Sequence, residues 1–245
     1  MKRLLVLALA VTGILTAGCI VRFGTLITED DTSHFVGLAS NLTNVDVVAA
    51  SVQVDFLDNS GRVISTVNTS PCTRTLQKHK DSPIEASLPE GVTAKKVQTT
   101  VRPLTFGTKA VADLDVDEDN IVITTSDSTT HIKGTVDVGN DDLRAVNVCA
   151  ALFDNDGNVL AVGSHKTSPA NINEDGSGTF DVSIDTSTID IDDVDQYELW
   201  VDALTRSPSD VTAPVVVGPN DVEIASTPTP TKTATPAPTA TSPPP

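Results

Sequence analysis

An aspartate-rich stretch is the best candidate for metal chemistry in this sequence. In DLDVDEDNIVI (113–123), Asp115, Asp117 and Asp119 have the 1, 3, 5 spacing of oxygen ligands in a calcium-binding loop. The twelfth position of such a loop should be a bidentate glutamate, but here it is Ser126, and no helix is predicted on either side. The three aspartates are therefore a weak calcium site, and a solvated acidic loop is the favoured interpretation.

A second acidic stretch, LFDNDGNVL (152–160), predicts a turn instead of a metal site. Its counterpart FLDNSGRVI (56–64) keeps the first aspartate and the glycine but has Ser60 where the other has Asp156. Asp and Asn bond to nearby backbone amides, and Gly supplies a positive φ, so both stretches suit hairpin corners.

No pattern of a known catalytic site stands out. The sequence has no G-x-S-x-G, phosphate-binding glycine loop, CxxC or HExxH, so we predict no catalytic residues and no cofactor. His34 and His131 occupy matching places in a repeat described below, which favours a shared structural role.

The first residues predict export. Lys2 and Arg3 precede an apolar run (4–15) that is too short to span a bilayer, and small residues follow it. The stretch LTAGC (15–19) resembles the lipobox of prokaryotic lipoproteins, although Thr16 stands where that family usually has Leu. The resemblance implies a signal peptide over 1–18 and a lipid on Cys19, which would anchor the protein to a membrane. Residues 19–31 are then predicted to be a linker.

The middle of the chain is a tandem repeat. AASVQVDFLDNSGRVI (49–64) recurs as AVNVCAALFDNDGNVL (145–160), and four shorter landmarks recur in the same order. Within each copy, apolar and polar residues alternate with period two, which indicates half-buried strands. We therefore predict an all-β protein of two tandem immunoglobulin-like β-sandwich domains, over 32–126 and 129–226.

The corners FLDNSG and LFDNDG resemble those of FxLYD domains of exported prokaryotic proteins. Asp58 and Asp154 match the aspartate of that family's pattern, whereas Leu57 and Phe153 stand where it often has Tyr. The likeness covers about the first two thirds of each copy, and it implies an immunoglobulin-like extracellular module without a general catalytic activity.

Several single residues leave alternatives open. Cys72 and Cys149 lie in different copies and form either an interdomain disulfide or two free thiols, with free thiols favoured. Trp200 is either a packing anchor, which is favoured, or an exposed aromatic for ligand stacking. Asn41 and Asn68 begin N-glycosylation sequons on a chain predicted to be exported.

Charge and composition restrict the partners. The net charge is −17, or −19 without Lys2 and Arg3, and such a surface repels nucleic acid. The excess of Asp over Glu and the scarcity of Lys resemble the acid-rich proteins of salt-loving archaea, with an ordinary acidic bacterial protein as the alternative. The Thr/Pro-rich segment 227–245 predicts a disordered tail.

The sequence is compatible with two functions. The leading hypothesis is a non-catalytic, lipid-anchored protein on the outer side of the cell membrane whose modules bind a protein, a glycan or calcium, or have a structural role in the envelope. The alternative is a solute- or cation-binding accessory subunit of an exported enzyme or transporter, with its ligand between the modules near Trp200.

Overall fold

The computed structural model describes residues 7–8, 18–29, 31–126, 128–206 and 210–222. The predicted tail (227–245) and most of the predicted signal peptide lie outside these residues. Leu7–Ala8 is described as a short strand, β1, paired with Thr25 and Leu26. No helix in the described part of the chain is long and apolar enough to cross a membrane.

The first module is a sandwich of two antiparallel sheets, as the period-two pattern predicts. One sheet has the strand order β1-β2-β3-β6 and the other has the order β5-β4-β7. The strands after β1 are β2 (Cys19–Glu29), β3 (Thr32–Asn41), β4 (Val47–Leu57), β5 (Val63–Thr69), β6 (Asp81–Ser87) and β7 (Lys96–Phe106).

The second module repeats this plan. Its sheets have the orders β13-β10-β8, with β9 also paired to β10, and β12-β11-β14-β15. The strands are β8 (Leu114–Val116), β9 (Val122–Ser126), β10 (Thr129–Val138), β11 (Leu143–Phe153), β12 (Val159–Lys166), β13 (Ser177–Asp185), β14 (Gln196–Thr205) and β15 (Val215–Asp221). Two 3-10 turns, Glu118–Asn120 and Ile191–Asp193, complete the elements.

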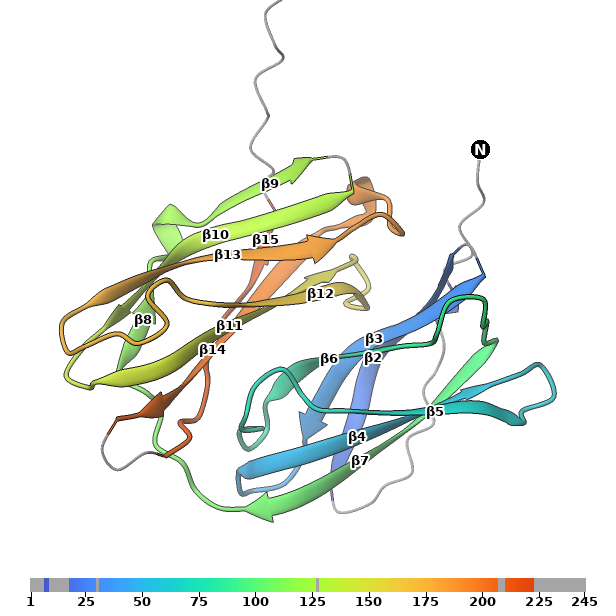
Figure 1. The fold of residues 1–245 in the computed structure, drawn as a ribbon, viewed down its shortest axis with the longest axis horizontal. Coiled ribbons are helices and arrows are strands. Elements are labelled where there is room, and N and C mark those ends of the chain that lie inside the picture. The colour runs from blue at the N-terminus through green and yellow to red at the C-terminus, as the bar shows by residue number, and fades with distance from the viewer. Residues whose placement is uncertain (1–6, 9–17, 30, 127, 207–209, 223–245) are drawn as a thin grey trace, which may run out of the picture.

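The four sheets stack in layers, which Figure 1 shows from top to bottom: the β10 sheet, the β11 sheet, the β3 sheet and the β4 sheet. Each module has its own core between its two sheets. The first contains Phe35, Phe56 and Leu76, and the second contains Ile132, Phe180 and Leu199. The all-β sandwich prediction is confirmed.

The module boundaries differ from the predicted ranges 32–126 and 129–226. Residues 19–29, predicted to be a linker, form β2, which pairs along β3 and contributes Val21 and Leu26 to the first core. Strands β8 and β9 pair with β10 and bury Leu114 and Ile123 in the second core. The first unit therefore starts one strand earlier and the second starts two strands earlier, because the first landmark of each repeat lies on β3 and on β10.

The corner prediction is also confirmed. One carboxylate oxygen of Asp154 accepts hydrogen bonds from the backbone amides of Asp156 and Asn158, at 3.0 and 2.7 Å, and Gly157 has a φ of 78°. Asp58 makes the same two contacts in the first module, where Gly61 has a φ of 81°. Backbone geometry thus explains why acids and glycines gather at these corners.

Replacing the corner aspartate should weaken the second module. We expect Asp154→Ala to lower the free energy of unfolding by about 1 to 2 kcal/mol, because two corner amides lose their acceptor. Asp156→Ala, at an exposed neighbouring side chain, should change it by less than about 0.5 kcal/mol. Urea denaturation measures both variants, and equal losses would contradict the account of the corner.

Candidate functional site

The junction between the modules is the most distinctive site of the molecule, because two outward-facing sheet surfaces are buried there. Ile27, Val36 and Leu38 of the first module pack against the β11 sheet of the second. The second module contributes Cys149, Ala151, Phe153, Val159 and Trp200. This third apolar cluster joins the two sandwiches along their middle layers.

Trp200 is the largest side chain of the junction, and its exposed fraction is 0%. It lies on β14 directly opposite Cys149 of β11. The favoured prediction of a packing anchor is confirmed, and the alternative of an exposed stacking residue is wrong. Trp200 packs against the first module. Periodicity within the second copy could not indicate this contact.

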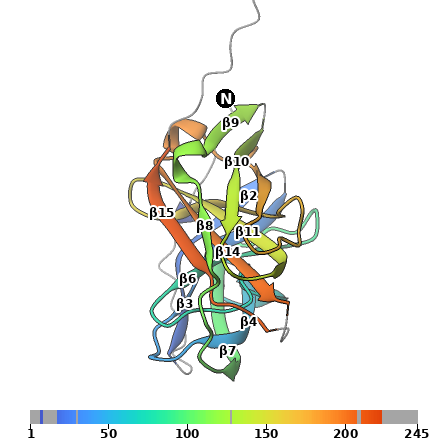
Figure 2. The ribbon, with the colours of Figure 1, turned by 90° about the vertical axis from the view of Figure 1, so that its left-hand side faces the viewer.

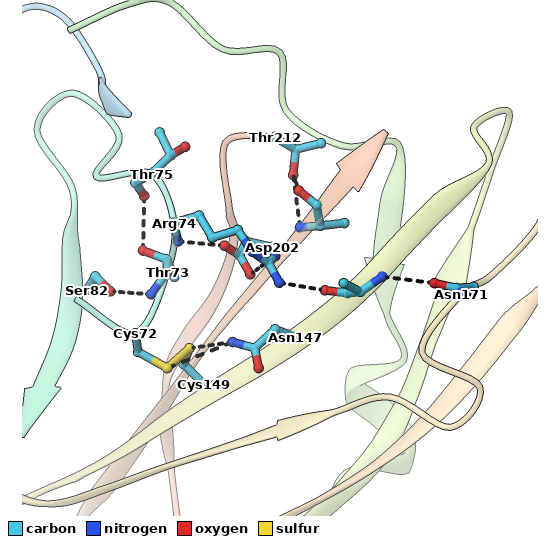
Figure 3. A network of polar contacts seen from close by, with 12 residues as sticks. Cys72, Thr73, Arg74, Thr75, Ser82, Asn147, Cys149, Asn171, Asp202 and Thr212 are labelled. Atoms are coloured by element: carbon cyan, nitrogen blue, oxygen red, sulfur yellow. Dashed lines mark hydrogen bonds and ion pairs between the residues drawn. A yellow bond between two sulfur atoms is a disulfide. The ribbon is translucent and has the colours of Figure 1, made fainter. Parts of the chain in front are cut away.

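A partly buried ion pair crosses the same junction (Figure 3). The fully buried carboxylate of Asp202 accepts hydrogen bonds from the backbone amide of Arg74, at 2.6 Å, and from its guanidinium, at 3.0 Å. The guanidinium also donates to the carbonyl of Ala145, at 2.9 Å. Each of the two carboxylate oxygens of Asp202 therefore has a partner in Arg74.

Cys72 and Cys149 form a disulfide beside this ion pair, with their Cα atoms 6.2 Å apart. The favoured prediction of two free thiols is therefore wrong, and the interdomain alternative holds. Cys149 alternates onto the outer face of β11, as its position in the pattern indicates, but that face is covered by the first module. The docking of the modules brings the two sulfurs together.

A groove of about 320 Å³ opens next to the disulfide. Cys72, Pro83 and Glu85 line it from the first module, and Val162 and Ser164 line it from the second. Trp200 is fully buried and does not line this groove, so a ligand in the groove would not stack on its ring.

Two acidic residues on the junction side of β14, Glu198 and Asp202, have raised pKa values. Burial, with a contribution from the charge of Asp81, raises the pKa of Glu198 to about 7, although Lys80 partly opposes this. Burial raises the pKa of Asp202 to about 6, against the opposing effects of the Arg74 charge and amide. Both groups therefore favour their neutral forms in the folded protein more than in an unfolded chain.

The predicted calcium ligands do not form a site. Asp115 lies on β8, whereas Asp117 precedes the 3-10 turn that contains Asp119. The side-chain amide of Asn120 donates to Asp117 at 2.6 Å, which stabilises a local turn. Among the described residues, no group of three His, Cys, Asp or Glu side chains is placed to hold a metal ion, so the structure does not bring the three aspartates together and calcium binding stays a prediction.

The two predicted glycosylation sites differ. Asn41 is fully buried, and its side-chain amide donates to the carbonyls of Val45 and Leu76 at 2.8 and 2.9 Å. A glycan cannot be attached there in the folded protein, so this prediction is wrong. Asn68 is exposed on β5, and its modification stays a prediction.

Cys19 is the first residue of β2, and its side chain is buried in the first core. Burial raises the pKa of its thiol. Its sulfur lies 3.8 Å from the side-chain oxygen of Asn41.

His131 forms a contact with Asp181 at 2.8 Å and one with Ser183 at 3.3 Å, across the paired strands β10 and β13. The residue types are those of a nucleophile, a base and an acid. However, both contacts use the same ring nitrogen of His131, whereas a catalytic relay uses one nitrogen for each partner. We therefore interpret the group as a cross-strand polar cluster.

Comparisons with known proteins identify no family. No family model matches the chain, and no curated protein matches it. Among solved structures, a red sea bream transglutaminase is 12% identical over 82% of this chain, with a TM-score of 0.25. An FMN-binding β-glucuronidase from Faecalibacterium prausnitzii is 14% identical over 76% of it, with a TM-score of 0.24. The chain spans 31% of the length of each, and likeness at this level carries no functional argument.

The raised pKa of Glu198 leads to a test of the junction. Folding retains a proton on this group between about pH 4.5 and pH 7, so the free energy of unfolding should fall as pH rises through that window. Glu198→Gln should flatten the profile above pH 6, where more than half of Asp202 has lost its proton. The measurement is urea denaturation followed by the fluorescence of Trp200, the single tryptophan.

Glu174→Gln, at an exposed glutamate of the second module, is the matched control. It should leave the shape of the profile unchanged. A Glu198→Gln protein with the parent's slope between pH 6 and pH 7.5 would contradict the assignment.

Proposed function

We propose that this chain is a non-catalytic, lipid-anchored protein on the outer side of the cell membrane. Its two docked β-sandwich modules bind a protein or glycan partner or serve a structural role in the envelope. The observation that best supports export is the Cys72–Cys149 disulfide, because structural disulfides persist mainly in oxidising compartments. The export pattern of residues 1–19 supports the same location.

The anchor would be Cys19. Acylation requires this buried side chain to leave the first core. Cleavage after Gly18 would also remove the Gly18 carbonyl, which accepts a hydrogen bond from the Leu42 amide at 2.7 Å. Release of this contact frees the first residue of β2, while pairing farther along β2 keeps the strand in the sheet.

The FxLYD resemblance supports a binding or structural module. The junction supports it as well, because the disulfide, the Arg74–Asp202 pair and the Trp200 cluster fix the two modules together. Such an assembly presents one continuous surface to a partner outside the cell.

The alternative function is an accessory subunit that captures a small solute. The groove of about 320 Å³ beside the disulfide favours this alternative. A thermal-shift screen of small solutes tests it: a ligand that stabilises the parent protein, but not a Val162→Trp protein with a filled groove, would support it.

The intact mass of the membrane-extracted protein tests the anchor. We expect a chain that begins at Cys19 and carries the added mass of a diacylglyceryl group, and we expect Cys19→Ser to lose this group and to leave the membrane fraction. A chain cut at another residue, or one that retains residues 1–18, would contradict the proposed anchor. It would not contradict the binding or structural role proposed for the modules.

We also propose that the protein works in concentrated salt. Five aspartates line one surface hollow of about 280 Å³ in the second module, namely Asp154, Asp190, Asp192, Asp193 and Asp195. The repulsion between these five carboxylates is weakened when the screening length falls to about 3 Å in molar salt.

Salt dilution should therefore destabilise the second module. We expect the melting temperature to fall when sodium chloride is reduced from about 1 M to below about 0.1 M, where the screening length reaches about 10 Å. Asp192→Asn with Asp193→Asn should reduce this dependence, measured by circular dichroism. A melting temperature that does not change with salt concentration would contradict the proposal that the protein works in concentrated salt.

A further inference from the structure

The charge of the chain is divided unequally between its modules. Residues 19–109 contain nine Lys or Arg and nine Asp or Glu, whereas residues 110–226 contain four and 24. Nearly all of the excess negative charge therefore belongs to the second module. The first module can approach an anionic surface that would repel the second.

One end of the first module, together with Val111 at the start of the segment that leads into the second module, exposes both apolar and basic side chains. We call it the basal surface and define it by Leu42, Val45, Lys78, Lys80, Phe106 and Val111. The four apolar members are 44%, 44%, 50% and 52% exposed, in that order, and both lysines are exposed as well. Large apolar side chains in such a group are unusual on a strongly charged protein.

Two buried side chains hold the loops of this surface together. Asp46 accepts hydrogen bonds from the amides of Lys78 and Lys109, each at 2.9 Å. Asn41 bonds to the carbonyls of Val45 and Leu76. The loops after β3, before β6 and after β7 are therefore fixed to one another, and the exposed side chains belong to a preformed surface.

The predicted anchor residue lies at the same end. Cys19 pairs with Asn41 across β2 and β3, and the neighbouring Leu42 belongs to the basal surface. In Figures 1 and 2 this end of the first module, where β7 finishes and β4 begins, lies at the bottom. Strand β9 of the acidic module lies at the top of both views.

We propose that the basal surface docks on an anionic lipid membrane. The inference rests on the proposed anchor at Cys19, and it adds the orientation of the protein: apolar side chains enter the interface, and Lys78 and Lys80 contact acidic headgroups. Exposed apolar residues flanked by lysines match the chemistry of a negatively charged leaflet. The end of the acidic module that contains β9 then points away from the lipid.

The test uses the mature chain from residue 19 with Cys19→Ser, tethered by an N-terminal histidine tag to vesicles that contain a nickel-chelating lipid. A bimane probe is placed at Val45→Cys or at Val122→Cys, an exposed position on β9. On phosphatidylcholine vesicles with phosphatidylglycerol and a quencher in the acyl chains, we expect the Val45 probe to be quenched at least about threefold more than the Val122 probe.

Charge reversal shows whether the basal surface orients the protein on the membrane or whether the tether alone does so. Lys78→Glu with Lys80→Glu, checked for folding by circular dichroism, should reduce quenching at Val45, as should pure phosphatidylcholine. Equal quenching at both positions, or none at Val45, would overturn the proposal. So would protection of the Val45 probe from a soluble quencher without vesicles, which would indicate a second copy on this surface.

The tether makes this result independent of acylation. Loss of the anchor by mass measurement, together with selective quenching at Val45, would refute lipidation and retain a lipid-binding surface. An acylated protein without selective quenching would retain the anchor and refute the orientation.

Discussion

The burial of two outer sheet faces against each other determines how the molecule is organised. A sandwich normally hides one face of each sheet and leaves the other in water. Here the second faces of the β3 and β11 sheets are also covered, so Trp200, Cys149 and Asp202 leave water although none of them belongs to a module core. The disulfide geometry, the Arg74–Asp202 pair and the raised pKa of Glu198 all depend on this contact.

Local patterns in the sequence were enough to predict what is local in the structure. Alternation identified strands, and the chemistry of Asp, Asn and Gly identified the corners at Asp58 and Asp154, because the relevant bonds join residues at most four apart. The start of each module was predicted wrongly, because β2 has no matching landmark and because β8 and β9 fall within the range 32–126 that was assigned to the first copy. The linker interpretation of residues 19–31 failed for the same reason.

The errors at candidate sites have a different cause, which is contact between distant segments. Asn41 has the sequence of a glycan acceptor, but its amide connects loops 35 residues apart in the chain. The pairing of Cys72 with Cys149 required knowledge of how two modules dock. The only signal in the sequence was that Cys149 and Trp200 face outward on their strands, and one sequence does not reveal which outward faces are covered.

The Cys72–Cys149 bond also has a mechanical consequence. It joins residues 77 positions apart, one in each module. When β2 and β15 are pulled away from each other, tension passes through this covalent bond and bypasses the chain between the two cysteines. The strands β6 to β10 lie within that protected segment, so stretching the protein can peel away its outer parts but cannot extend this segment until the bond is reduced.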